Sequence, residues 1–114
     1  MIRVGINGLG RIGRAIFRII SEVEDIKVSH INDINPSIDN LVYLIKYDSV
    51  YGKLNKNITV KNNQIAFNKD LIKVTNNSQI DKVDWSQSNV DIVIESSGVL
   101  SNHESAHKLC LSGI

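Results

Sequence analysis

The chain has 114 residues, with 13 basic and 12 acidic side chains and a formal net charge of +1. This length favours one domain with a single core, and the balanced charge argues against a nucleic-acid surface or an anionic membrane as a partner. No apolar run reaches the ~18 residues needed to span a bilayer, and the single cysteine excludes an internal disulfide, which fits a cytoplasmic location.

The first predicted element is a strand over residues 2–7 that leads directly into a glycine-rich turn. Gly8, Gly10 and Gly13 have the spacing G-x-G-x-x-G and precede an amphipathic stretch. A strand that turns tightly into a helix presents unpaired amides and a partial positive charge, which form an anion site. Gly8 permits the turn, Gly10 lets the backbone approach a pyrophosphate, and Gly13 allows close helix packing. The pattern indicates a dinucleotide-binding βαβ unit.

The helix after this turn is expected to present the amides of Gly10, Arg11 and Ile12 to the phosphates. Its apolar residues recur at the spacing of one helix face. They are Ile12, Ala15, Ile16, Ile19, Ile20 and Val23. We expect this face to pack on the sheet.

A second strand is predicted over residues 26–32, and Asp33 follows at its end. An acidic side chain there can accept hydrogen bonds from both hydroxyls of an adenosine ribose and repels a 2′-phosphate, so NAD is favoured over NADP. The alternative is a solvated Asp that caps the segment before Pro36. His30 is interpreted as a packed or edge histidine rather than a general base, because no nucleophile is near it in the sequence.

Beyond residue 35 the pattern predicts a helix and then a small antiparallel meander. Pro36 and Ser37 start the helix, whose apolar positions are Leu41, Val42, Leu44 and Ile45. The meander consists of three short β-rich pieces, at residues 58–60, 64–67 and 71–75. Asn62 and Asn63 separate the first two pieces, and paired asparagines tolerate the positive φ of a tight turn. We expect this insertion to shape the adenine side of the site.

A buried parallel strand is predicted over residues 90–95, followed by Ser96, Ser97 and Gly98. Ligands of open α/β sheets bind outside the carboxyl ends of the strands, so this turn is expected to complete the cofactor crevice. An ordinary loop is the alternative. The expected fold class is α/β, a Rossmann-type parallel sheet with flanking helices and a small antiparallel insertion, incomplete at the C-terminus.

A competing motif lies near the end of the chain. His103, Glu104 and His107 match the H-E-x-x-H pattern of zinc metalloproteases. A catalytic zinc needs a third protein ligand, and the residues after His107 include no His, Asp or Glu. We therefore expect no metal site, and place both histidines on the outer side of a crossover helix within residues 101–113. Cys110, on the same helix, is interpreted as a small buried apolar side chain.

Five segments occur in order along the chain: residues 5–14 (Gly-Ile-Asn-Gly-Leu-Gly-Arg-Ile-Gly-Arg), 31–33 (Ile-Asn-Asp), 47–53 (Tyr-Asp-Ser, then Gly-Lys), Trp85, and residues 95–99 (Glu-Ser-Ser-Gly-Val). Together they resemble the phosphorylating glyceraldehyde-3-phosphate dehydrogenases. The resemblance runs from the first residue to the last. Several motifs in the right order are more specific than one glycine pattern.

The resemblance implies a set of NAD-binding residues. The residues around the pyrophosphate would be Asn7, Gly8, Gly10, Arg11, Ile12 and Gly13. Asp33 would bind the adenosine ribose, and the nicotinamide half would lie beside Ser96, Ser97 and Gly98. Ser78 is also named as a cofactor-binding residue, although this chain departs from the family there, since many members place an arginine near the adenine where it has residues 76–78 (Asn-Asn-Ser).

The resemblance also implies that the catalytic residues lie elsewhere. Family members carry a nucleophilic cysteine and a histidine base in a later domain, so residues 1–114 would be a truncated NAD-binding domain with no catalytic residue and poor stability alone. The whole enzyme, a cytoplasmic homotetramer of glycolysis, would convert glyceraldehyde 3-phosphate and inorganic phosphate to 1,3-bisphosphoglycerate. Erythrose-4-phosphate dehydrogenase, whose members tend to have Glu at the position of Asp33, and a catalytically empty nucleotide-binding module are the alternatives.

Overall fold

The computed structural model describes residues 1–48, 52–54 and 56–98. The helices and strands are β1 (Ile2–Asn7), α1 (Arg11–Ile20), β2 (Ile26–Asn32), α2 (Ile38–Lys46), β3 (Tyr47–Asp48), β4 (Gly52–Lys53), β5 (Ile58–Lys61), β6 (Gln64–Phe67), β7 (Asp70–Thr75), η1 (Ile80–Lys82), η2 (Trp85–Ser88) and β8 (Ile92–Glu95). All but β3 and β4 of the strands belong to one sheet, and those two form a short antiparallel ribbon.

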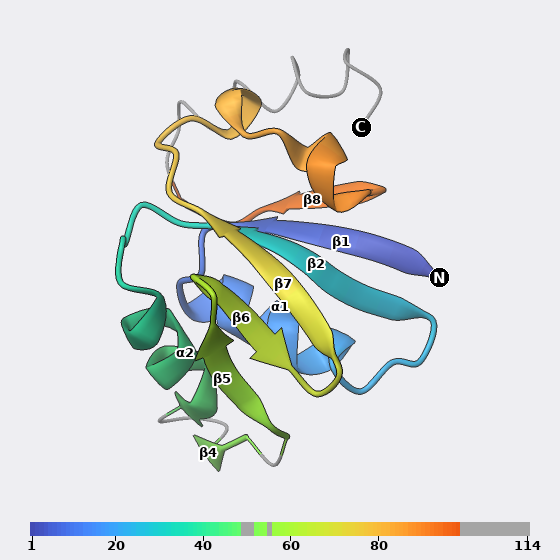
Figure 1. Cartoon of the computed structure of the whole chain (residues 1–114), viewed down its shortest axis with the longest axis vertical. Coiled ribbons are helices and arrows are strands. Elements are labelled where there is room, and N and C mark those ends of the chain that lie inside the picture. Colours follow the sequence, from blue (N-terminus) through green and yellow to red (C-terminus); the bar gives the residue numbers. More distant parts are fainter. Residues whose placement is uncertain (49–51, 55, 99–114) are drawn as a thin grey trace.

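The main sheet has the strand order β5-β6-β7-β2-β1-β8 (Figure 1). Strands β7, β2, β1 and β8 run parallel to one another. The chain passes from β1 to β2 to β7 in one direction and then returns to place β8 on the other side of β1. Strand order therefore reverses beside β1, which is where doubly wound sheets bind ligands. The predicted Rossmann-type α/β fold is confirmed.

The predicted meander is present, and its turns use asparagines as expected. Asn62, Asn63 and Asn68 have φ values of 53°, 58° and 53°, and both hairpins are antiparallel. The last strand, β7, also pairs in parallel with β2. The meander therefore extends the main sheet, and its final strand is the third parallel strand of the Rossmann unit.

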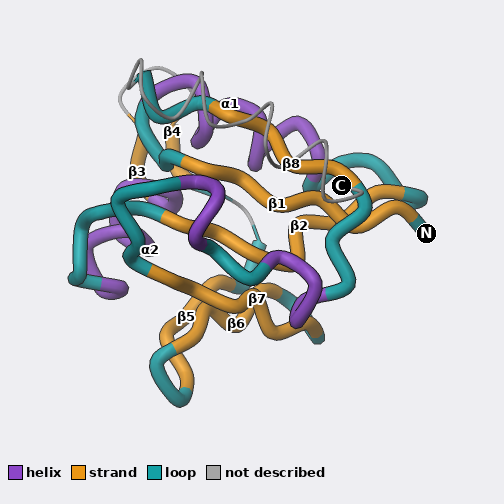
Figure 2. Tube along the Cα trace, turned by 90° about the horizontal axis from the view of Figure 1, so that it is seen from above, coloured by secondary structure: helices purple, strands orange, loops and turns teal. Residues whose placement is uncertain are grey.

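The sheet is covered on both faces. Helices α1 and α2 pack on one face through the larger apolar core, and the short helices η1 and η2 carry a smaller core on the other face (Figure 2). The alternation along β1 shows the two layers, because Val4 and Ile6 belong to the larger core while Gly5 faces Trp85 of the smaller one.

The predicted face of helix α1 is only partly correct, because Ile16 and Ile20 pack against the larger core but are not the most buried residues of the helix. Gly13 and Phe17 are its buried residues, whereas Ile12 and Ile19 are 66% and 65% exposed and Val23 lies beyond the helix end. The reason is the close approach at Gly13, which has no side chain to keep the helix away from the Gly8 carbonyl. That contact rotates the Gly13–Phe17 line toward the sheet.

Helix α2 begins directly after Ser37, as the Pro36–Ser37 pair predicts. The Ser37 hydroxyl accepts a hydrogen bond from the amide of Asn40 at 3.2 Å, which satisfies one of the amides left open at a helix start. At the other end, the Arg18 guanidinium donates to the Ile45 carbonyl at 2.7 Å. A cation at a helix C-terminus is favourable, so this contact helps to fix α1 against α2.

Gly5 is required by the packing of Trp85. The indole is 1% exposed, and its Nε1 donates to the Ile80 carbonyl at 3.1 Å. A Cβ on Gly5 would lie 2.6 Å from two carbons of the indole ring. The ring therefore lies directly against the backbone of β1, and any side chain at this position would displace it.

Strand β8 is parallel to β1, as predicted, but it is not buried. Within the described residues it forms one edge of the sheet, and Ile92 is 50% exposed. The predicted crossover helix with His103, Glu104 and His107, as well as Cys110, falls outside the described residues. Among those that are described, none of the helices is long and apolar enough to cross a membrane, and no three acidic, His or Cys side chains are grouped to hold a metal.

Replacing Gly5 by alanine should destabilise the protein by about 1–3 kcal/mol, because the new methyl group overpacks the core against Trp85. Urea unfolding monitored by tryptophan fluorescence measures the loss. Gly10→Thr is the matched control, since a Cβ at Gly10 meets no atom within 4 Å and threonine and glycine are about equally good at the N-cap position that Gly10 occupies. Equal stability of Gly5→Ala and the parent would contradict this account.

Candidate functional site

A crevice of about 610 Å³ opens at the carboxyl ends of β1 and β2. This volume lies within the ~300–1,000 Å³ typical of small-molecule and cofactor sites. The position is the one expected for a nucleotide in a doubly wound sheet, next to the reversal of strand order. The lining residues are Asn7, Gly8, Leu9, Gly10, Asn32, Asp33, Ile34, Asn77, Ser78, Gln79 and Ser97.

The three glycines of the turn have different physical roles. Gly8 has a φ of 94°, and a Cβ there would lie 2.6 Å from the Ser97 amide nitrogen. A Cβ on Gly13 would collide with the Gly8 carbonyl oxygen. Gly10 has a negative φ and no atom within 4 Å of where its Cβ would be, so the protein's own packing does not require a glycine there. Only the open space in front of Gly10 would be lost to a side chain.

Asp33 holds the turn in place as well as facing the crevice. Its Oδ2 accepts a hydrogen bond from the amide of Leu9 at 2.6 Å, and its Oδ1 accepts one from the amide of Asn35 at 2.9 Å. Each carboxylate oxygen has capacity for a second hydrogen bond. The side chain is therefore fixed by two backbone amides and can still receive two donors from a ligand.

Each of the four parallel strands ends in a polar residue. In register across the sheet, Asn7 of β1 is paired with Asn32 of β2 and with Glu95 of β8, and Asn32 is paired with Thr75 of β7. The Asn7 and Asn32 side chains are 2% and 1% exposed. Hydrogen bonds connect all four side chains beneath the crevice, and we call this set the strand-end network.

Asn32 lies at the centre of the strand-end network and uses its full hydrogen-bonding capacity. Its Nδ2 donates to the Asn77 carbonyl at 2.8 Å and to Asn7 Oδ1 at 2.7 Å. Its Oδ1 accepts from the Asn77 amide at 2.9 Å and from the Thr75 hydroxyl at 2.7 Å. The backbone carbonyl of Asn77 can only accept and its backbone amide can only donate, so these two groups fix which end of the Asn32 side-chain amide faces each of them.

This orientation propagates through the strand-end network in both directions. Toward β8, Asn7 must present Oδ1 to Asn32, so its Nδ2 donates to Glu95 Oε1 at 3.0 Å. Toward β7, the Thr75 hydroxyl donates its proton to Asn32 Oδ1, so the same hydroxyl oxygen accepts from His30 Nε2 at 2.9 Å. His30 Nδ1 then accepts from the Ser88 hydroxyl at 3.0 Å.

His30 is a packed histidine, as predicted, and a β-bulge places it. Val4 pairs with Val28 and Gly5 with His30, so Ser29 is an extra residue in β2. The bulge turns His30 away from the helix side, where Val28 packs, and toward Trp85, whose ring centroid is 4.6 Å from that of His30. Burial, helped by the charge of Lys73 and opposed by that of Asp84, lowers the pKa of His30 from 6.5 to about 4.

The predicted site residues fall into two groups. Six of them line the crevice together: Asn7, Gly8, Gly10, Asp33, Ser78 and Ser97. Of the others, Gly13 and Ser96 lie behind Gly8, with the Ser96 hydroxyl donating to the Gly8 carbonyl at 2.8 Å. Arg11 and Ile12 form the exposed first turn of α1, and Gly98, with φ of 73°, is exposed beyond β8.

Sequence reasoning did not assign four residues that fix the crevice by hydrogen bonds, namely Asn32, Thr75, Asn77 and Glu95, nor the lining residues Leu9, Ile34 and Gln79. A signal for Asn32, Thr75 and Glu95 was present, because each stands at the end of a parallel strand, where side chains meet along one edge of the sheet. Asn77 acts through its backbone, which no side-chain pattern reveals.

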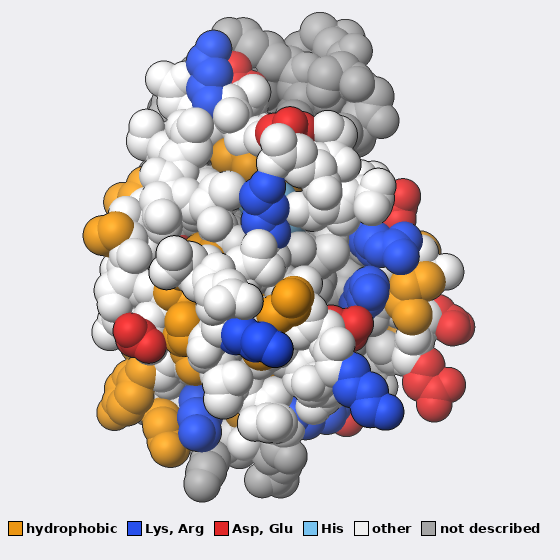
Figure 3. Space-filling view, viewed as in Figure 1, with side chains coloured by type: hydrophobic (Ala, Val, Ile, Leu, Met, Phe, Trp, Pro, Cys, Tyr) orange, Lys and Arg blue, Asp and Glu red, His pale blue; other side chains and the backbone are white. Residues whose placement is uncertain are grey.

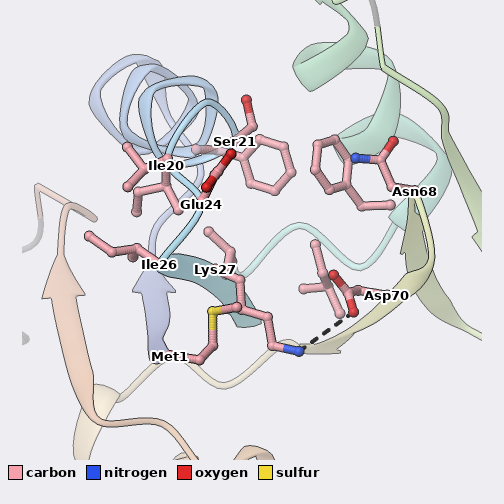
Figure 4. Close-up of a pocket in the computed structure, with 13 residues that line it drawn as sticks. Met1, Ile20, Ser21, Glu24, Ile26, Lys27, Asn68 and Asp70 are labelled. Carbon is pink, nitrogen blue, oxygen red and sulfur yellow. Dashed lines mark ion pairs between the residues drawn. The ribbon is translucent and has the colours of Figure 1, made fainter.

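A second, smaller pocket of about 160 Å³ lies at the opposite end of the sheet, between the end of α1 and the β6–β7 turn (Figure 4). The Phe17 and Phe67 rings meet edge to face among its lining residues, with centroids 5.1 Å apart. Lys27 and Asp70 form an ion pair of 3.5 Å at its edge. It is at the amino end of β2, away from the glycine turn and the strand-end network.

Charged side chains of both signs are interspersed on the face shown in Figure 3. Lys56 and Glu22 form an ion pair of 3.0 Å. Solvent-exposed pairs of this kind stabilise a protein by at most about 1 kcal/mol. The geometry of the crevice therefore depends on its buried polar contacts rather than on surface charge.

Comparison with known proteins identifies one family. The family described as "Glyceraldehyde 3-phosphate dehydrogenase, NAD binding domain" matches residues 2–103. The glyceraldehyde-3-phosphate dehydrogenase of Buchnera aphidicola subsp. Schizaphis graminum is 42% identical over 113 residues, which are 98% of this chain and 33% of that protein. The cytosolic enzyme of Trypanosoma brucei brucei is 37% identical over 99% of this chain and 34% of its own length. The chain spans about a third of the curated relatives it matches.

The buried His30 predicts how stability depends on pH. Its folded-state pKa of about 4 lies below the ordinary 6.5, so the unfolded chain binds a proton in this window and the folded chain does not. The free energy of unfolding should therefore fall as the pH drops from 6.5 to about 4, by up to about 3 kcal/mol, and His30 should add no change outside this window.

Urea unfolding at about pH 7 and about pH 5 measures this dependence, with His30→Gln as the comparison. Other groups titrate in both proteins, so the difference between the two isolates His30. The parent should lose more stability than His30→Gln on acidification. Parallel losses would show that His30 is not the source.

Proposed function

Because the chain belongs to the glyceraldehyde-3-phosphate dehydrogenase family and matches its NAD-binding domain, we propose that the crevice at the ends of β1 and β2 binds NAD. The observation that carries this proposal is the open space in front of Gly10, at the start of α1. In the described structure, only a ligand gives a reason for a glycine there. NAD supplies a hydride acceptor, and the residues of this domain bind and orient it.

The pyrophosphate is assigned to the turn between β1 and α1. The first amides of a helix lack partners within the helix and carry a partial positive charge. Arg11 and Ile12 provide these amides, and Asn7 with Gly8 form the floor of the crevice beside them. Gly13 supports the site from behind, because its contact with the Gly8 carbonyl holds α1 close to the turn.

The adenosine ribose is assigned to Asp33. The amides of Leu9 and Asn35 hold both carboxylate oxygens in place, so the carboxylate is pre-oriented for two ribose hydroxyls. The same negative charge repels a 2′-phosphate, which favours NAD over NADP. Ser78 lines the same crevice, and we assign it to the adenine.

The nicotinamide half is assigned to the turn after β8. Ser97 lines the crevice, and Ser96 binds the Gly8 and Asn7 carbonyls, so this turn is fixed to the end of β1. Gly98, which follows with a positive φ, extends the turn beyond the strand. This assignment places the reactive end of NAD near the strand-order reversal.

For the whole protein we propose the phosphorylating oxidation of glyceraldehyde 3-phosphate to 1,3-bisphosphoglycerate, by a cytoplasmic homotetramer. The domain match and the identities of 42% and 37% to proteins named for this enzyme support it. The catalytic cysteine and histidine are then expected in a separate domain. Residues 1–114 would contribute cofactor binding and orientation.

Substitution of Gly10 by threonine should weaken NAD binding roughly tenfold or more, because the added side chain occupies the space in front of the α1 amides. The free energy of unfolding should be close to that of the parent, because a Cβ at Gly10 meets no atom of the protein within 4 Å. Isothermal titration with NAD measures the affinity. Gly5→Ala is the reciprocal control and should lose stability while keeping its affinity for NAD. Parent-like NAD affinity of Gly10→Thr would contradict the pyrophosphate assignment.

The protein that contains this chain should reduce NAD when glyceraldehyde 3-phosphate and inorganic phosphate are both present, measured by absorbance of NADH. We expect a kcat/KM at least roughly tenfold higher with NAD than with NADP, since Asp33 repels the 2′-phosphate. Erythrose 4-phosphate provides the competing substrate. A higher kcat/KM with erythrose 4-phosphate would favour the related dehydrogenase, and the absence of activity with both substrates would favour a nucleotide-binding module.

A further inference from the structure

Glu95 joins two elements of the crevice with one oxygen atom. Its Oε1 accepts from Asn7 Nδ2 at 3.0 Å and from the Ser97 backbone amide at 3.0 Å. Asn7 is the last residue of β1, and Ser97 is in the turn after β8. Glu95 itself is not among the lining residues of the crevice, so it acts on a ligand only through its neighbours.

The strand-end network requires a hydrogen-bond acceptor at residue 95. Asn77 fixes the Asn32 amide, and Asn32 in turn fixes the Asn7 amide with its Nδ2 toward β8. Two N–H donors, one on Asn7 and one on Ser97, thus converge on the same point beside β8. A residue without an acceptor would remove the hydrogen bond that each of these donors makes to residue 95 in a partly buried place, which costs free energy.

We propose that Glu95 is a positioning residue for the cofactor, and that it sets the distance between the glycine turn and the Ser96–Ser97 turn. Ser97 is close enough to Gly8 that a Cβ there would lie 2.6 Å from the Ser97 amide. A small movement of Ser97 therefore changes the width of the crevice. This inference rests on the proposed NAD site.

The role assigned to Glu95 is that of an acceptor rather than a charge. Both bonds use one oxygen, and the amide oxygen of glutamine can occupy the same place and accept the same two protons. Methionine has a similar length and shape but no comparable acceptor. The pair Glu95→Gln and Glu95→Met therefore separates hydrogen bonding from side-chain size and from negative charge.

The test uses these two variants in the protein that contains this chain, with two measurements on each. Isothermal titration gives the NAD affinity, and amide hydrogen exchange reports on the Ser97 N–H directly. Glu95→Met should bind NAD roughly tenfold more weakly and exchange the Ser97 amide faster. Glu95→Gln should restore both properties to within about twofold of the parent. Ile65→Ala, in β6 of the meander, is the control for a general loss of stability, and it should leave NAD affinity unchanged.

Each outcome decides between the readings. Parent-like affinity and exchange in Glu95→Met would overturn the positioning role. Equal weakening of Glu95→Gln and Glu95→Met would also overturn it, because charge would then be the property that matters. If Ile65→Ala weakened NAD binding as much as Glu95→Met, the effect would be one of general stability and the proposal would fail. A parent that binds no NAD would refute the proposed function instead, while the Ser97 exchange still tests the geometry.

Discussion

The structure depends on how closely two segments approach the backbone of Gly8. The start of α1 meets it at Gly13, and the turn after β8 meets it at Ser97. Side chains at Gly8 or Gly13 would keep these segments apart, because the space between the backbones is smaller than a methyl group requires. The close approach brings the amides of the helix start and the polar strand ends to the same edge of the sheet, where the crevice opens.

The strand-end network converts that approach into a fixed geometry. Parallel strands leave their carboxyl ends side by side, and here the end residues are polar, buried or partly buried, and mutually hydrogen-bonded. A buried polar group without a partner costs about 1–3 kcal/mol, so a network in which each member satisfies the next has few alternative arrangements. The Asn32 side chain makes all four of its hydrogen bonds, and its fixed orientation decides which atoms of its neighbours donate and which accept. The crevice is preorganised by this layer, and preorganisation lowers the entropy that binding must otherwise lose.

On the face of the sheet that carries η1 and η2, packing is organised around Trp85 and His30. Trp85 packs against Gly5 of β1 and beside His30 of β2, and the bulge at Ser29 turns His30 toward it. His30 then reaches Thr75, so the smaller core contacts the strand-end network directly. A single buried histidine thereby connects the packing of η2 with the residues below the crevice, and its low pKa keeps it neutral near pH 7.

The sequence by itself determined the strands at residues 2–7 and 26–32, the glycine turn, the asparagine hairpins and the position of Asp33, because local turn chemistry and hydrophobic period are properties of neighbouring residues. It also indicated the family through the order of its motifs. Only the tertiary structure decided which line of α1 is buried, that β7 joins β2, and that Glu95, Asn7, Asn32 and Thr75 form one network. These features arise from contacts between residues up to 88 positions apart, which no local period in the sequence encodes. The same holds for the orientation of His30, because the bulge in β2 turns its side chain to the other face of the sheet.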